Sequence, residues 1–166
     1  MRKIEIIMVN ENDAPFLQEL MNNESVMTVL NETPTTVNIW AAAITEWLQD
    51  SDEEDYIIYD DSKPIGWLGI NGLSAEDKKA YIKMIALLPE YQNCGIGQCV
   101  ITEIIENLGS RGYVSIGLYT DQSNIQAQQC YFKCGFHITS EAEQKMSNGA
   151  VVKRYIMEKF IDNSKA

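Results

Sequence analysis

The segment of this sequence most suited to chemistry is a loop with two glycines, Gln92-Asn93-Cys94-Gly95-Ile96-Gly97-Gln98. It follows an apolar run, 80–88, and opens a segment in which apolar residues recur at helical spacing. The first turn of a helix leaves backbone N–H groups unpaired and carries a partial positive charge, so it binds a pyrophosphate well when no bulky side chain intervenes. Gly95 and Gly97 allow that approach. On the loop alone, a helix entry that merely needs flexible backbone angles stays open as the alternative.

The surrounding residues disfavour two other phosphate-binding motifs. A P-loop requires Gly-Lys-Ser or Gly-Lys-Thr after the loop, and neither follows here. A dinucleotide-binding fingerprint requires a third glycine and an acidic residue about 20 positions further on. Val100 stands at the third glycine position, and Gly117 lies 20 residues after Gly97. A nucleoside triphosphatase and a Rossmann-type enzyme are therefore both disfavoured.

The loop and the strand before it resemble the GNAT superfamily of acyl-CoA-dependent N-acetyltransferases. The central motif of that family is Gln or Arg, two residues, Gly, one residue, then Gly or Ala, and Gln92, Gly95 and Gly97 match it. The preceding strand ends in Ile85-Ala86-Leu87-Leu88-Pro89, which is similar to the family's central strand. The following helix agrees as well.

A second segment extends the resemblance toward the C-terminus. Asn124 is followed seven residues later by Tyr131, and then by Gly135 and Phe136, which resembles the family's Asn, Tyr and Gly-Phe pattern. Together the two segments span about 80–136. The order of the flanking elements is also similar, so the combined signal is far more specific than the glycine loop.

The resemblance implies that acetyl-CoA is the cosubstrate and lies where two neighbouring parallel strands, 80–88 and 114–119, separate. The first strand would pair its backbone with pantetheine as an added strand does, backbone amides of 93–98 would bind the pyrophosphate, and the Asn124 side-chain amide would hold the pantetheine arm. Cys94 would contribute only its backbone amide. The residues implied in cofactor binding are Ile85, Ala86, Leu87, Gln92, Asn93, Cys94, Gly95, Ile96, Gly97, Gln98 and Asn124.

Tyr131 is the predicted catalytic residue. Acetyl transfer to an amine needs a neutral amine, stabilisation of the developing oxyanion and a proton for the departing thiolate. Tyr131 matches the family's tyrosine acid, and a phenol with an ordinary pKa near 10 stays protonated at neutral pH. A tyrosine that merely packs in a helix is the alternative, and the spacing from Asn124 argues against it.

The sequence departs from the family at the general base. Many relatives place a glutamate near the start of the central strand or in the strand before the Asn, and the corresponding positions here are Tyr81 and Tyr119. Neither phenol is a ready base at neutral pH. Deprotonation would fall to a water chain or to another carboxylate, for which Asp121 and Glu32 are candidates, although ordinary loop acids are the simpler interpretation. The base is left unassigned.

The charge of the chain favours a cationic partner. Lys and Arg number 13 against 24 Asp and Glu, a net charge of -11, which repels nucleic acid. Acids cluster at 50–55, which we interpret as a solvated loop that could also steer a cationic amine. No run approaches the roughly 18 apolar residues of a membrane helix, and no signal peptide is recognised. We expect a cytoplasmic protein with an amine acceptor, with neither nucleic acid nor membrane as partner, and with a homodimer left open.

The cysteine and histidine content disfavours a metal site. Cys94 and Cys99, and Cys130 and Cys134, lack the CxxC spacing of a zinc knuckle, so reduced, unliganded thiols are expected. His137 is the only histidine, so a site built on several imidazoles cannot form. We therefore expect no metal.

Hydrophobic periodicity predicts the elements of the first half. A strand is expected at 2–9, followed by a short helix capped by Asp13. Thr33-Pro34 offers the start of a second helix, whose apolar face is Trp40, Ala43, Ile44, Trp47 and Leu48. Two strands, 56–59 and 65–70, are expected to form an antiparallel hairpin.

The second half alternates strands and helices. It is expected to contain the strand 80–88, a helix after the glycine loop, the strand 114–119, a helix capped by Ser123 or Asn124, and two strands at 136–141 and 151–160. We predict one α/β domain over 1–166, a GNAT-like, mostly antiparallel mixed sheet with a central splayed parallel pair and helices on both faces.

Two functions are consistent with these features. The first is an N-acetyltransferase that moves acetyl from acetyl-CoA to a primary amine, a cationic small molecule or a peptide N-terminus, by direct transfer in a ternary complex. The second is a non-catalytic acyl-CoA sensor or scaffold, which the absent glutamate leaves open. The presence of both Asn124 and Tyr131 favours the enzyme. Trp40, Trp47 and Trp67 could line an acceptor pocket, although aromatic residues at such spacings more often belong to a core.

Overall fold

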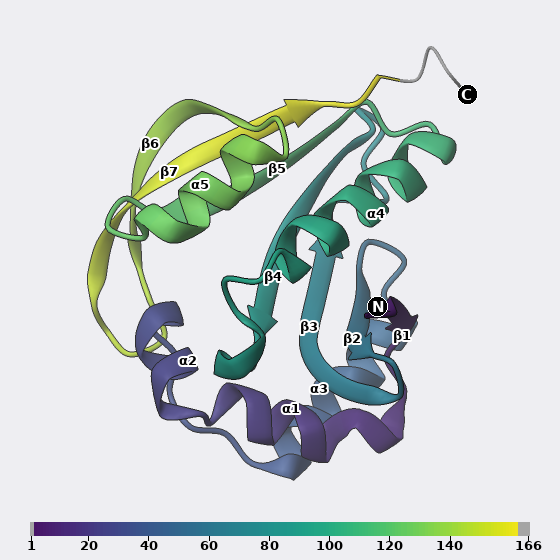
Figure 1. Cartoon of the computed structure of the whole chain (residues 1–166), viewed down its shortest axis with the longest axis vertical. Helices are drawn as coiled ribbons and strands as arrows, with labels where there is room; N and C mark the ends of the chain where they lie inside the picture. The colour runs from purple at the N-terminus through teal and green to yellow at the C-terminus, as the bar shows by residue number, and fades with distance from the viewer. Residues whose placement is uncertain (1, 163–166) are drawn as a thin grey trace.

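Seven strands form one mixed sheet in the order β1-β2-β3-β4-β5-β7-β6 in the computed structural model, which describes residues 2–162 (Figure 1). All neighbouring strands are antiparallel except β4 and β5 in the centre, which are parallel. The predicted mixed sheet with a central parallel pair is confirmed. The strands are β1 Ile4–Met8, β2 Glu54–Asp60, β3 Lys63–Asn71, β4 Lys79–Leu87, β5 Ser115–Asp121, β6 His137–Lys145 and β7 Val151–Phe160.

Helices cover both faces of the sheet, as predicted. One face carries α4 and α5, which lie in front of the sheet in Figure 1, and the other carries α1 and α3. The helices are α1 Ala14–Met21, α2 Glu24–Leu30, α3 Val37–Gln49, α4 Ile96–Ser110 and α5 Ile125–Lys133, with short 3-10 turns η1 Glu11–Asp13 and η2 Pro89–Tyr91. In residues 2–162 no helix is both long and apolar enough to cross a bilayer.

Two hydrophobic cores hold these layers together because successive side chains of a strand point to opposite faces. Ile58 and Leu68 pack with the α4 side chains in one core, and their chain neighbours Ile57 and Trp67 pack with α1 and α3 in the other. A central strand that is buried on both faces appears in the sequence as a continuous apolar run. This run is why the sequence predicts β3.

The helices of the N-terminal region differ from the prediction. An additional helix, α2, begins after Asn23, whose Oδ1 accepts from the backbone N–H of Ser25 at 3.1 Å and Val26 at 3.3 Å. The expected start at Thr33-Pro34 is wrong, because α3 begins at Val37 with Thr36 as its cap.

The expected Asp13 cap is also wrong, because Asp13 forms no side-chain cap bond to α1. Its Oδ2 instead accepts from the backbone N–H of Asn10 at 2.8 Å. Asn10 in turn caps the 3-10 turn η1. The acidic side chain therefore stabilises the turn before the helix.

Candidate active site

The parallel pair β4–β5 opens part-way along its length. Its last paired residues are Ile82 and Leu118, although β4 continues to Leu87 and β5 to Asp121. A cavity of about 590 Å³ lies at this opening and is lined by both diverging strands. The opposite edge of β4 stays paired with β3, where Leu68 lies opposite Ile85. The β4 backbone beyond Ile82 is therefore available to an extended ligand on the side of β5.

The N-terminus of α4 points its unpaired amides into this region. Gly95 is the cap residue, with φ +85° and no side chain to bond the first turn. The first helical bond recorded at this end runs from the Cys99 N–H to the Gly95 carbonyl at 3.1 Å, so the N–H groups of Ile96, Gly97 and Gln98 have no acceptor within the helix. These donors, together with the positive end of a 15-residue helix, suit a pyrophosphate.

Two polar side chains complete this part of the cavity. The Gln92 Nε2 donates to the Leu87 carbonyl at 2.9 Å, which ties the loop to the end of β4. Asn124 caps α5 by accepting the Ala127 N–H at 3.1 Å, which leaves its amide NH2 as the group able to donate to a ligand. Capping by Asn124 is one of the two alternatives expected from sequence.

Ten of the twelve predicted site residues line the cavity. They are Ile85, Ala86, Leu87, Gln92, Asn93, Gly95, Gly97, Gln98, Asn124 and Tyr131. The other two have side chains directed elsewhere: Ile96 is 3% exposed within the core, and the Cys94 Sγ donates to the Tyr91 carbonyl at 3.1 Å. Cys94 and Ile96 could therefore contribute only backbone amides.

Tyr131, the predicted catalytic residue, also lines the cavity. It lies on α5 and is otherwise buried, with its ring 6.0 Å from that of Phe136. Burial, and then the neighbouring Cys130 thiol, raise the pKa of Tyr131 well above the usual range of a phenol. The hydroxyl therefore stays protonated at neutral pH and is suited to donate a proton.

Comparison with known proteins supports the resemblance seen in these residues. A model of the acetyltransferase (GNAT) family matches residues 17–136. The chain belongs to the GNAT family. It is also 29% identical over 102 residues to an uncharacterised N-acetyltransferase of Methanocaldococcus jannaschii, a match that covers 58% of this chain and 45% of that protein. The match thus spans less than half of that relative.

Solved GNAT structures share the fold over nearly the whole chain. A spermidine N-acetyltransferase from Vibrio cholerae, in complex with CoA and spermine, superimposes with a TM-score of 0.85 at 19% identity, covering 95% of each chain. A GNAT acetyltransferase from Streptococcus pneumoniae gives a TM-score of 0.77 at 20% identity, covering 96% of this chain and all of the other. At these identities the superpositions show a shared fold and no more.

The candidate bases of this GNAT chain differ in their surroundings. Glu32 and Asp121 both line the cavity, but Asp121 lies 3.2 Å from the Arg154 Nε and accepts from the Asn31 Nδ2 at 3.0 Å. Tyr119 also lines the cavity, whereas Tyr81 borders a second cavity of about 460 Å³ next to it. The pairing of Asp121 makes Glu32 the less constrained carboxylate of the two.

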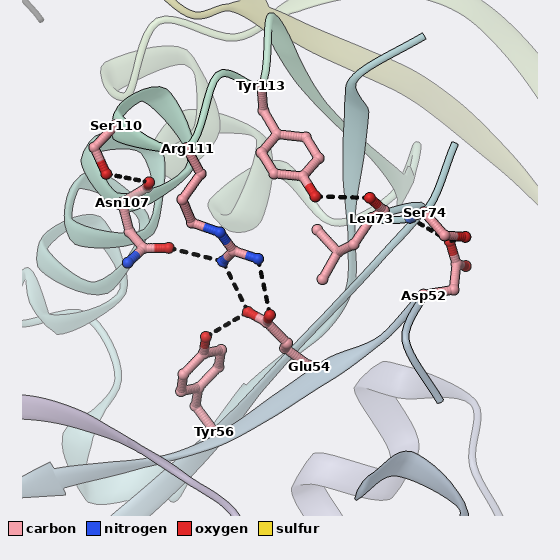
Figure 2. Close-up of polar contacts among 9 residues, drawn as sticks. All are labelled: Asp52, Glu54, Tyr56, Leu73, Ser74, Asn107, Ser110, Arg111 and Tyr113. Carbon is pink, nitrogen blue, oxygen red and sulfur yellow. Dashed lines mark hydrogen bonds and ion pairs between the residues drawn. The ribbon is translucent and has the colours of Figure 1, made fainter. Parts of the chain in front are cut away.

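Only part of the acidic segment 50–55 is the solvated loop expected from its composition. The Glu54 carboxylate accepts from both terminal nitrogens of Arg111, at 2.9 and 2.8 Å, and from the Tyr56 hydroxyl at 2.6 Å. The Asp52 carboxylate accepts from the Ser74 hydroxyl at 2.6 Å (Figure 2). The interpretation is wrong for Glu54, because Arg111, 57 residues away in sequence, neutralises its charge. Asp52 stays near the surface and is held there by its hydrogen bond to Ser74.

The other two paired acids of the segment share one ammonium. Lys83 on β4 contacts the Glu53 carboxylate, and its Nζ lies 3.2 Å from the Asp55 Oδ1. Asp55 is 1% exposed and also accepts from the Trp67 Nε1 at 2.8 Å. Burial, together with the adjacent Glu53 carboxylate, raises the pKa of Asp55 to about 8.

The raised pKa of Asp55 makes stability depend on pH. Between about pH 4, where an unfolded Asp titrates, and about pH 8, the folded chain holds a proton that the unfolded chain has released. The free energy of unfolding should therefore fall as pH rises through this window, by at most about 1.4 kcal/mol per pH unit from this group. Urea unfolding at pH 5 to 8.5 should show a smaller fall for Asp55→Asn than for the wild type. If the free energy of unfolding fell equally with pH in the two proteins, the pH dependence would not come from Asp55.

Sequence reasoning missed several residues of the cavity wall. Val26, Val29 and Leu30 of the unpredicted helix α2 form part of its wall, and Lys83 and Arg154 line it as well. A local signal existed for α2, because Asn23 precedes Glu24 and an apolar pair, as at many helix starts. No local pattern marks Lys83 or Arg154, whose positions depend on the sheet.

Proposed function

We propose that this GNAT chain transfers the acetyl group of acetyl-CoA to a primary amine by direct transfer in a ternary complex. The observation that carries the proposal is one continuous cavity that connects three features. These are the open edge of β4, the uncapped N-terminus of α4 and the buried Tyr131. The spermidine acetyltransferase of the same fold supports an amine as acceptor.

The proposed reaction uses this chain's groups in three ways. The β4 backbone and the α4 amides bind acetyl-CoA so that its thioester lies near Tyr131. The neutral amine attacks the thioester carbon, the carbon–sulfur bond breaks, and the departing thiolate takes the proton of the Tyr131 hydroxyl. The new amide nitrogen releases its extra proton to solvent or to a carboxylate, and solvent restores the Tyr131 proton. No acetylated enzyme forms.

A screen of amines tests this function. Wild-type protein is mixed with acetyl-CoA and one amine at a time, including alkylamines, diamines and short peptides, and the free thiol is recorded. At least one amine should give saturable thiol release above the rate without protein. If calorimetry shows CoA binding and no amine supports turnover, the proposal fails in favour of a non-catalytic sensor.

A cationic acceptor is the finer part of the proposal. Since Glu53, Glu54 and Asp55 are paired with Lys83 or Arg111, the attraction comes mainly from the net charge of -11 spread over the chain. The apparent KM for a cationic amine should rise severalfold between about 20 and 300 mM salt, because the Debye length shortens from roughly 20 Å to below 8 Å. A KM that is independent of salt would contradict electrostatic capture.

A further inference from the structure

The Lys83 ammonium sits in a cage of aromatic rings and acidic side chains. Its Nζ lies 4.2 Å from the centre of the Trp47 ring and 5.4 Å from that of Trp67. The same nitrogen contacts Glu53 and lies 3.2 Å from the Asp55 Oδ1. Indole faces and carboxylates at these distances are the groups that bind an alkylammonium most favourably.

The cage is closely packed around its occupant. The rings of Trp47 and Trp67 stack at 5.2 Å, and Trp40 packs edge-on against Trp67 at 5.5 Å. A Cβ at Gly69 would lie 2.5 Å from the Lys83 Cε, so only glycine leaves room for the lysine stem at this position. The walls would therefore keep their shape if the lysine side chain were shortened.

Lys83 connects the cage with the two cavities. It lines both the 590 Å³ cavity and the neighbouring 460 Å³ cavity. In the described part of the chain neither the three tryptophans nor Glu53 and Asp55 are among the residues that line those cavities. Within residues 2–162, Lys83 is thus the member of this cluster that also borders the two cavities.

We propose that Lys83 is a specificity-determining residue: its ammonium fills a cation cage that would otherwise take the distal ammonium of a diamine or polyamine. This inference rests on the proposed amine acetylation and deepens it. Because the Lys83 ammonium already occupies the cage, the cage cannot bind the second ammonium of an acceptor. The chain therefore favours acceptors that are recognised through one amine alone. Removing the stem beyond Cβ opens a space that matches n-propylammonium, the fragment that Lys83→Ala deletes.

Competing acceptors provide the first test. The ratio of kcat/KM for α,ω-diamines of three to six carbons to that for n-alkylamines of equal length is measured in wild type, Lys83→Ala and Lys83→Met. In Lys83→Ala the ratio should rise about tenfold or more, as expected for a desolvated cation–π site. The rise should occur for the diamine long enough to place one amine at the thioester and the other in the cage. It should stay near the wild-type value in Lys83→Met, whose side chain still fills the cage. An unchanged ratio in Lys83→Ala overturns the inference.

Thermal unfolding provides a second test that needs no turnover. Millimolar n-propylammonium chloride should raise the Tm of Lys83→Ala by several degrees more than that of wild type or Lys83→Met, with sodium chloride as the ionic control. If Lys83→Ala does not fold, Lys83→Ala/Asp55→Asn removes the buried acidic group that has lost its lysine partner and keeps Glu53 and both indoles. Equal shifts in all proteins overturn the cage. Absence of turnover with every amine, alongside a selective Tm shift, instead refutes the proposed function.

Discussion

Replacing Tyr131 by Phe should lower kcat by about 10²- to 10⁴-fold while leaving the affinity for CoA nearly unchanged. Only the hydroxyl is lost, and it is the group proposed to protonate the departing thiolate. The ring would keep its place in the core against Phe136, 6.0 Å away. Single-turnover thiol release, measured where chemistry limits the rate, and calorimetry with CoA provide the two quantities.

A second tyrosine of the same cavity serves as the matched control. Tyr119 lines the cavity but is 46% exposed, and the family resemblance aligns it with a position where a carboxylate was expected. Tyr119→Phe should change kcat by less than about threefold, because its phenol is not proposed to transfer a proton. If Tyr131→Phe retained the wild-type single-turnover rate, Tyr131 would be a packing residue and the general-acid assignment would be wrong.

Introducing a carboxylate at Gly97 should weaken CoA binding by about 10²- to 10³-fold. Two unit charges 4 Å apart repel by about 4 kcal/mol at an effective dielectric constant near 20, which corresponds to that range. The fold should survive, because a Cβ at Gly97 would meet only the Cys130 Sγ, at 3.8 Å. The negative charge of an Asp in the first turn also interacts favourably with the helix dipole, which stabilises the helix. Gly97 is a better position than Gly95, whose φ of +85° would strain any side chain.

Gly97→Asn separates charge from shape. Asn has nearly the same volume as Asp but no charge, so Gly97→Asn should weaken CoA binding much less than Gly97→Asp does. Calorimetry gives both affinities, and thermal unfolding confirms that both variants are folded. A Gly97→Asp protein that binds CoA as tightly as wild type would contradict the proposal that the pyrophosphate binds at the N-terminus of α4.

The sequence predicted the elements whose signals are local. The central strands are apolar on both faces, and the α4 entry is marked by Gly95 and Gly97. Helix α5 follows its cap Asn124 and ends before Gly135, which has φ +94°. Each signal depends on propensity, capping or backbone conformation within a few residues. The family motif coincides with these elements, so most of the predicted cofactor residues were found to line one cavity.

What the sequence could not predict depends on contacts between distant segments. Composition made 50–55 look solvated, but Glu54 is paired with Arg111, 57 residues away. The Lys83 cage combines side chains from α3, β2, β3 and β4, and no spacing within one element specifies it. The three tryptophans pack on one another, and Trp47 and Trp67 also contact Lys83, so the expectation that they belong to a core describes them better than an acceptor lining.

The central claim is that the opening between β4 and β5 presents acetyl-CoA to an amine for direct transfer. The most direct measurement quantifies free CoA thiol and N-acetylated amine by mass spectrometry in the same wild-type reaction, with and without acceptor. The account predicts equal amounts of the two products, saturation in both substrates and no acetylated protein when the amine is omitted. Thiol release without matching N-acetylated amine, or a protein carrying a covalent acetyl group that the amine then removes, would contradict it.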